Sequence, residues 1–302
     1  MSRALSLPFA SPSPTLMGEG STRPARVPRL VVFLALSAIL SIGASSAADA
    51  FYQVNGGPQH AGSLGSGSWM TPTAADWSYD PSSDPLFPIG TTGFNRDAQP
   101  VYAASADLFV AVATGASTNG ASYLVAVDAT TGTRAWFRLV RSFNGFGSDS
   151  SPAYSNGFVY WVGSDDQGAT EVLKINASNG STDTADGGWT VRLDPPQVVN
   201  ASPTVADGKV FVSTYANSFA SPPVVAQHFA LDQADGSVIW SNADGGSGQG
   251  APAYDPSRDW IYQTVDNPNG DDVLRAYQAD TGTEVWTSSA TFASTPDRKS
   301  VV

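Results

Sequence analysis

The chain contains no cysteine among its 302 residues. Disulfides and thiolate metal centres are therefore excluded, as is a lipid anchor carried by a cysteine behind a leader peptide. Only two histidines occur, His60 and His228, so a zinc or copper site built from imidazole ligands is not expected. Without covalent cross-links, the fold must be held by packing and hydrogen bonds.

Basic residues are also scarce, with 15 Lys and Arg against 27 Asp and Glu, which gives a net charge of −12. The lysines are Lys174, Lys209 and Lys299. A strongly acidic protein binds polyanions poorly, so a nucleic-acid partner is not expected. We interpret the acidic surplus, which lies mostly in turns, as a contribution to solubility.

Long apolar runs are missing except from Leu30 to Ile42. Three arginines precede this run and small residues follow it at 44–48, which is the pattern of a secretory signal. Thirteen residues are fewer than the about 20 that a membrane span needs. We therefore expect residues 1–50 to be a disordered segment and secretory signal, cleaved near Ala47 or Ala50.

The expected location is accordingly secreted or periplasmic, without a stable membrane span after cleavage. An uncleaved N-terminal anchor is the alternative. Met17 is an alternative start to Met1, because it shortens the segment before the apolar run to a more ordinary leader.

A turn glycine followed by a tryptophan recurs along the rest of the chain. The glycines are spaced 48, 56 and 46 residues apart, and a proline that leads each unit is spaced 52, 51 and 49 residues apart. Self-similarity at this period indicates a repeat architecture. The repeated residues are Gly132, Gly180, Gly236 and Gly282, Trp136, Trp189, Trp240 and Trp286, and Pro100, Pro152, Pro203 and Pro252.

Each unit begins with two β-rich runs divided by a polar or glycine-bearing break. Asn-Gly and Asp-Gly accept the positive φ angles of tight hairpins, which favours hairpins at 155–157 and 206–208. A third strand leads into the glycine turn and a fourth carries the tryptophan. Four strands in roughly 50 residues are one blade of a β-propeller, so the fold class is all-β. The paired runs are 101–112, 153–162, 204–214 and 253–265.

A blade buries its two faces against its neighbours. We therefore interpret Trp136, Trp240 and Trp286 as core residues between blades and not as ligand platforms. Asp128 and Asp232 recur at one repeat position, which favours a role in the turn over a role in a single active site.

The run Ala126–Trp136, together with Ser-Pro-x-Tyr-x-Asn-Gly at 151–157, resembles the repeats of the pyrroloquinoline-quinone-type (PQQ-type) β-propeller superfamily. The resemblance covers residues 51–290, and 75–79 looks like a first Trp-bearing strand. It implies four-stranded antiparallel blades, about four to five of them, in an incomplete propeller spanning 51–296. Residues 297–302 interrupt the pattern, and we interpret them as a non-native or disordered tail.

That superfamily includes quinoprotein dehydrogenases and non-enzymatic propellers such as the outer-membrane assembly lipoprotein. The dehydrogenase branch implies a quinone over the central channel and a calcium ion held by acidic and amide side chains. Because the chain has no cysteine, it cannot form the vicinal disulfide typical of quinoprotein alcohol dehydrogenases and cannot attach haem covalently. It also lacks the lipid-bearing cysteine of the assembly lipoprotein.

No catalytic, cofactor-binding or metal-binding residue is predicted. His60 and His228 are expected to pack or to bond in turns. The acidic stretches 164–168 and 266–272 lack calcium-loop spacing and are read as polar turns. The glycine-rich stretch 245–250 opens no helix and so is not a phosphate loop. Three glycosylation sequons begin at Asn176, Asn179 and Asn200.

These observations favour an exported, non-catalytic propeller that binds a protein or small ligand on its face or rim. Two alternatives stay open. One is a fragment of a PQQ-dependent dehydrogenase with quinone and calcium, and the other is a carbohydrate-binding propeller of the cell surface.

Overall fold

A computed structural model describes ten stretches of the chain, and all the regular structure within them is strand except for two short 3-10 turns, η3 (Pro81–Ser83) and η4 (Thr184–Asp186). Among these residues no helix is long and apolar enough to cross a membrane. The predicted signal at 1–50, His60 and the tail at 297–302 lie outside them. The described stretches are 77–85, 91–94, 98–115, 121–141, 150–164, 170–193, 201–214, 226–243, 250–266 and 272–291.

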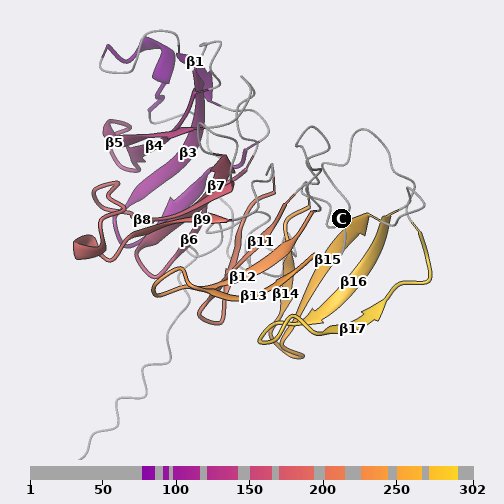
Figure 1. The fold of residues 1–302 in the computed structure, drawn as a ribbon. Coiled ribbons are helices and arrows are strands. Elements are labelled where there is room, and N and C mark those ends of the chain that lie inside the picture. The colour runs from indigo at the N-terminus through magenta and orange to yellow at the C-terminus, as the bar shows by residue number, and fades with distance from the viewer. Residues whose placement is uncertain are drawn as a thin grey trace, which may run out of the picture. The chain divides into compact units, whose positions relative to one another are not determined.

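The strands form four antiparallel sheets, each following the order of the chain (Figure 1). We call these sheets blades A to D, and they confirm the predicted four-stranded antiparallel unit. Blade A has an additional strand, β1 (Thr91–Phe94), which pairs with β3. The strands are β2 (Val101–Ala103), β3 (Leu108–Gly115), β4 (Ala121–Asp128) and β5 (Arg134–Arg141) in blade A; β6 (Ala153–Ser155), β7 (Phe158–Ser164), β8 (Thr170–Asn176) and β9 (Trp189–Leu193) in blade B; β10 (Thr204–Ala206), β11 (Lys209–Ser213), β12 (His228–Asp232) and β13 (Val238–Asn242) in blade C; and β14 (Ala253–Asp255), β15 (Trp260–Asp266), β16 (Asp272–Gln278) and β17 (Glu284–Thr287) in blade D.

The first hairpin of each blade forms where the break in the sequence predicts it. In blade B the two turn residues, Asn156 and Gly157, have φ angles of 50° and 86°. In blade C, Asp207 and Gly208 have φ angles of 48° and 71°. Two consecutive positive φ angles are the type I′ geometry that matches the twist of a hairpin.

The turn before the last strand is closed by an acidic or amide side chain and a glycine. In blade A, Asp128 Oδ1 accepts hydrogen bonds from the amides of Thr130 and Thr131 at 3.0 and 2.7 Å. The amide of Gly132 donates to the Asp128 carbonyl at 2.9 Å, with the Gly132 φ at 69°. Asp232 Oδ1 accepts from an amide in the same way, which confirms the structural role predicted for this repeat position.

Each of four tryptophans docks on the turn of the next unit, not on a glycine of its own unit. Its indole N–H donates to a backbone carbonyl of that turn, and its ring covers the turn glycine. A Cβ added at any of the four turn glycines would lie 2.6–2.9 Å from indole carbons, closer than real Cβ contacts allow. The donor and acceptor pairs are Trp77–Ala129 (2.8 Å), Trp136–Ala177 (2.8 Å), Trp189–Gln233 (3.2 Å) and Trp240–Ala279 (2.8 Å).

The accepting residue is held in place by its own blade. In blade B, the amide of Ala177 donates to the carbonyl of Gly157 in the first hairpin at 3.0 Å. The equivalent bonds in blades A, C and D measure 2.8–2.9 Å. One peptide unit therefore ties the two turns of a blade together and presents a fixed acceptor to the preceding blade.

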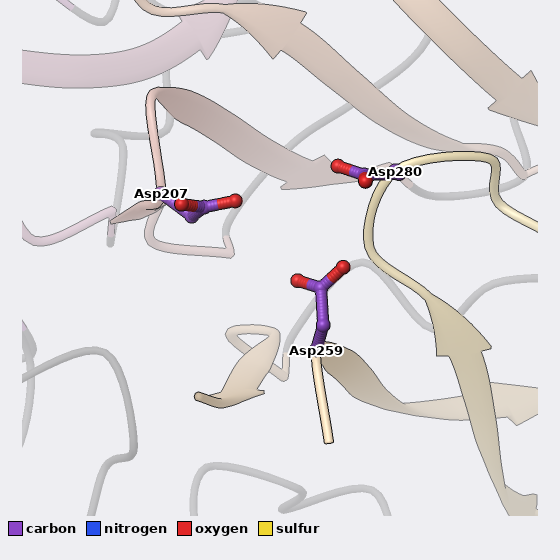
Figure 2. Close-up of side chains that lie close together, drawn as sticks. All are labelled: Asp207, Asp259 and Asp280. Carbon is purple, nitrogen blue, oxygen red and sulfur yellow. The ribbon is translucent and has the colours of Figure 1, made fainter. Parts of the chain in front are cut away.

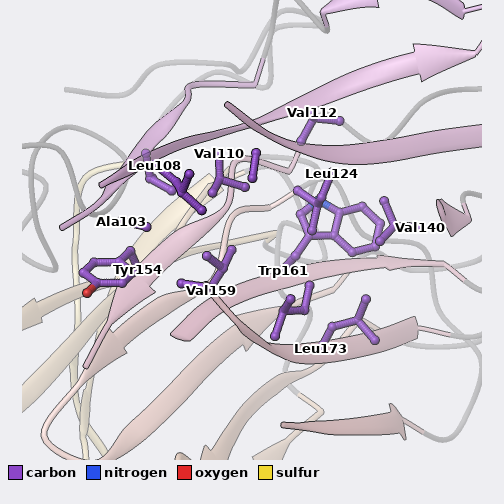
Figure 3. Close-up of a cluster of buried hydrophobic side chains, with 14 of the residues drawn as sticks. Ala103, Leu108, Val110, Val112, Leu124, Val140, Tyr154, Val159, Trp161 and Leu173 are labelled. Carbon is purple, nitrogen blue, oxygen red and sulfur yellow. The ribbon is translucent and has the colours of Figure 1, made fainter. Parts of the chain in front are cut away.

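Apolar side chains fill the space between successive blades, as the repeat predicts. Between blades A and B, Val110 and Leu124 face Val159 and Leu173, with Trp161 fully buried among them (Figure 3). The same positions bring blades B and C together around a second cluster. Because strand side chains alternate in direction, each sheet contributes one face to the blade before it and one to the blade after it.

The innermost strands also contact one another, β2 with β6, β6 with β10, and β10 with β14. Two of the four leading prolines, Pro152 and Pro203, follow a serine, and the contacts of these serines explain the Ser-Pro signal. Ser151 Oγ accepts from the amide of Gln99, and the Ser151 amide donates to Ser202 Oγ, both at 2.8 Å. Since proline has no amide hydrogen, the serine supplies the bonds at this point of the strand.

We predict that Gly180→Ala destabilises the protein more than Gly208→Ala. Both glycines have φ angles above +70°, so both substitutions strain the backbone, but only the Cβ at Gly180 meets the Trp136 ring, at 2.9 Å. The difference should be at least ~1 kcal/mol in the free energy of unfolding, measured in urea. An equal loss of unfolding free energy in the two variants would show that the docked ring does not contribute to stability.

Candidate functional site

Three aspartates from three turns converge between blades C and D (Figure 2). One carboxylate oxygen from each of Asp207, Asp259 and Asp280 lies within 4.8 Å of the others. Asp207 belongs to the β10–β11 turn, Asp259 to the β14–β15 turn and Asp280 to the β16–β17 turn. We call this group the carboxylate cluster, and it is the one such group of three among the described residues.

The backbone geometry of the repeat brings these side chains together. Asp207 and Asp259 hold the left-handed position of their hairpins, with φ angles of 48° and 57°. Asp280 follows Ala279, the residue whose carbonyl accepts the Trp240 indole. Docking of Trp240 therefore places the Asp280 turn of blade D against the first hairpin of blade C.

A lysine ammonium lies inside the carboxylate cluster. Lys209 Nζ is 2.6 Å from Asp280 Oδ1, 3.0 Å from Asp207 Oδ2 and 3.2 Å from the Asp207 carbonyl. An ammonium has three N–H donors, and these three oxygens accept all of them. The Lys209 side chain is 11% exposed, whereas those of Asp207 and Asp280 are 56% and 65% exposed.

Two pKa shifts follow from this arrangement. Burial alone lowers the pKa of Lys209, but the hydrogen bonds to Asp280 and Asp207 outweigh it, so the pKa lies above its ordinary value. Tyr254 donates to Asp259 Oδ1 at 3.1 Å. Burial, followed by this hydrogen bond, raises the pKa of Tyr254 to about 12, so the phenol keeps its proton at neutral pH.

Carboxylate oxygens are the ligands that calcium and magnesium prefer. Here, however, the Lys209 ammonium already lies between two of the three carboxylates and supplies the compensating charge. A metal ion would have to displace that ammonium and would still need several further oxygen ligands. The cluster is best understood as an ionic link between two blades.

Basic side chains make comparable links at the two other blade interfaces. Between blades A and B, Arg138 donates to the Gly180 carbonyl at 3.2 Å and to Thr182 Oγ1 at 2.7 Å. Between blades B and C, Lys174 Nζ donates to the Ala234 carbonyl at 3.3 Å and lies 4.3 Å from the centre of the Phe158 ring.

Lys174 occupies a strand position where the other three blades have alanine. Burial lowers the pKa of Lys174, and the negative charge of Asp232 acts in the opposite direction. Two of the three lysines of the chain are thus used to join blades.

His228 lies on the blade C face that packs against blade D, as the alternating pattern predicts. Its Nδ1 is 3.1 Å from Ser213 Oγ, and its ring centre is 5.7 Å from that of Tyr277. Ser213 and His228 are only 0% and 4% exposed. A serine beside a histidine can act as a nucleophile and base pair only where substrate reaches it. At this depth the pair serves packing.

The other polar motifs form turns or lie outside the described residues. Asn176 Oδ1 accepts from the Ser178 amide at 3.0 Å, and Asn179 Oδ1 accepts from the Ser181 amide at 2.9 Å. Turn chemistry therefore accounts for both of these asparagines, as it does for Asp128. Asn200, the Gly-rich residues 245–249 and most of 164–168 and 266–272 lie outside the described residues.

Sequence reasoning missed the carboxylate cluster and Lys209. The three aspartates are 52 and 21 residues apart, and no short motif links them. The repeat pattern is the sequence signal that could have revealed the cluster. Alignment of the blades puts two aspartates in first hairpins and one in a last turn, and the rule that tryptophan docks on the next turn would have brought those turns together.

We predict that Lys209→Met lowers the melting temperature at pH 7, because it leaves like charges facing each other, whereas Lys209→Arg does not. The loss should correspond to about 1 kcal/mol or less, as for partly exposed ion pairs. The raised pKa of Lys209 means that the wild-type link is complete below about pH 10.4 and is lost as pH rises through the folded pKa.

Calcium supplies the control for this prediction. If Lys209 is the cation of the cluster, millimolar calcium should leave the melting temperature of the wild type unchanged. A clear rise with calcium in the wild type that is absent in Asp259→Asn would contradict it.

Comparison with known proteins agrees with this architecture. Residues 120–258, and in an overlapping match residues 188–301, fit the family described as outer membrane protein assembly factor BamB. The two matches together span more than half of the chain. Among curated proteins no match was found.

The quinohemoprotein alcohol dehydrogenase of Comamonas testosteroni superposes with a TM-score of 0.51 at 18% identity, over 71% of this chain and 36% of that protein. BamB from Moraxella catarrhalis gives a TM-score of 0.37 at 15% identity, over 60% of this chain and 58% of that protein. The chain thus spans about a third of the length of the dehydrogenase, and the likeness concerns the fold. With its four docked blades and its sequence match, the chain belongs to the BamB family of PQQ-like repeat β-propellers.

Proposed function

We propose that the chain is an exported, non-catalytic propeller module. It binds another protein through its rim, by which we mean the edge formed by the last strands of the blades. This proposal rests on the positions of the exposed apolar side chains. Among the described residues, seven large hydrophobic side chains are 37–50% exposed, and five of them lie on the last strands of blades. Exposed apolar groups gathered on one part of a surface mark protein-binding sites. The five are Phe137 and Leu139 on β5, Val238 and Ile239 on β13, and Val285 on β17.

The use of the polar side chains supports a non-catalytic role. The repeated acidic and amide residues close turns, and the basic residues at the three blade interfaces bind carbonyls or carboxylates of the next blade. The Ser213–His228 pair is buried, and Lys209 neutralises two carboxylates of the carboxylate cluster.

Export is the part of the proposal that rests on sequence. The Arg-flanked apolar run before residue 44 fits a protein that works outside the cytoplasm. The matched family is described as an outer membrane assembly factor, and an envelope scaffold is the function that such a relative suggests for this chain. The location and the partner are both part of the proposal.

The rim is tested with the triple variant Val238→Ser, Ile239→Ser and Val285→Ser. A surface kept apolar for binding can be made polar without loss of folding, so each substitution should change the free energy of unfolding by less than ~0.5 kcal/mol. The variant should elute earlier than the wild type from a hydrophobic-interaction column. A large loss of stability would show that these residues serve the fold and would remove the basis of the proposal.

The main alternative, a piece of a PQQ-dependent dehydrogenase, is tested by adding pyrroloquinoline quinone and calcium to the purified chain. We expect no stoichiometric quinone binding by equilibrium dialysis and no dye-linked oxidation of alcohols or sugars. Stoichiometric binding with turnover would overturn the non-catalytic assignment.

A further inference from the structure

The interface between blades C and D changes from apolar to polar along its strands. Its apolar part is the cluster that contains Phe211 and Ile261. Two residues further along the same strands, and therefore on the same sheet faces, come Ser213 and Gln263. Their register partners on the neighbouring strands are also polar. The set, which we call the polar layer, is Ser213 and His228 on blade C, and Gln263 and Arg275 on blade D.

The same layer is apolar at the other two blade interfaces. The strand register identifies the equivalent positions, and the side chains there are only 0–4% exposed. Each member of the polar layer thus takes the place of a buried apolar side chain. The equivalents are Val112, Leu124, Trp161 and Leu173 between blades A and B (Figure 3), and Val162, Val172, Val212 and Phe229 between blades B and C.

Gln263 keeps one contact of the tryptophan whose position it occupies. Trp161 Nε1 donates to the Ser150 carbonyl at 3.2 Å, and Gln263 Nε2 donates to the Gly250 carbonyl at 2.9 Å. Ser150 and Gly250 both lie two residues before the leading proline of their blade. The amide reaches this acceptor with fewer atoms than the indole, so the side chain fills less of the layer.

The other half of the Gln263 amide is buried without a protein partner. Gln263 is 2% exposed, and its Oε1 accepts no hydrogen bond from the protein. A buried amide oxygen that is left unpaired costs free energy, and in folded proteins such acceptors are satisfied by protein or by ordered water. The C–D interface therefore needs a donor beside Gln263 Oε1.

The neighbouring polar side chains offer further hydrogen-bonding groups. Ser213 Oγ lies 3.1 Å from His228 Nδ1. Between blades A and B, the side chains at these two positions pack on the blade B tryptophan, so Ser213 and His228 are expected to face Gln263 (Figure 3). A hydroxyl, an imidazole and an amide oxygen then meet at one place. This suits an internal water, which typically makes about three hydrogen bonds.

We propose that the polar layer binds an internal water between blades C and D, which donates to Gln263 Oε1 and is held from the other side by Ser213 and His228. Water is the occupant because it both donates and accepts, and because it is small enough to enter a layer in which these three residues are only 0–4% exposed. The apolar layers of the other two interfaces hold no such water. This inference does not depend on the proposed function.

The test is the number of long-lived internal waters in the purified full chain, measured by oxygen-17 relaxation dispersion of the solvent. Gln263→Trp restores the side chain of blade B together with its N–H donor, and it should lose at least one such water relative to the wild type. Val212→Ala is the matched control, because it opens space at the equivalent position of an apolar layer. Apolar cavities stay dry, so its water number should not change.

A high-resolution crystal structure of the wild type gives a second readout, which holds even if Gln263→Trp fails to fold. It should show a water within about 2.5–3.0 Å of Gln263 Oε1. Equal numbers of long-lived waters in the wild type and a folded Gln263→Trp would overturn the proposal. So would a crystal structure in which Gln263 Oε1 accepts from a protein group or has no water in reach.

Discussion

The contact on which the rest of the structure depends is the indole of one blade seated on the last turn of the next. It combines a hydrogen bond of 2.8–3.2 Å with packing of the indole ring over a glycine. A Cβ at that glycine would leave no room for the ring. The acceptor carbonyl cannot move away, because the amide of the same residue is bonded to the first hairpin of its own blade. Docking therefore couples both turns of one blade to the last strand of the blade before it, and the apolar clusters between sheets form in register around that point.

Polar links are added where docking has already brought two turns together. Arg138, Lys174 and Lys209 each reach the next blade beside a docked tryptophan, from three different strand positions. The carboxylate cluster belongs to this set, and its ammonium explains how three aspartates lie so close together.

The sequence predicted the elements well, because each depends on a few neighbouring residues. Asn156-Gly157 and Asp207-Gly208 have the chemistry of type I′ hairpins, and both form them. His228 lies in an alternating strand and is buried between blades, as expected. What could not be predicted lies between units. The glycine and tryptophan of one repeat look like partners along the chain, yet each contacts the neighbouring repeat, and Asp207, Asp259 and Asp280 meet only across a blade interface that no local pattern reveals.

The most direct measurement of the central contact is hydrogen exchange of the indole N–H groups, followed by NMR in D2O with assigned tryptophan signals. An indole bonded to a fixed carbonyl exchanges only when the blades separate, so the N–H groups of Trp136 and Trp240 should be protected by orders of magnitude relative to a free indole. Exchange of Trp136 and Trp240 as fast as that of a free indole would contradict the view that tryptophan docking holds the blades together.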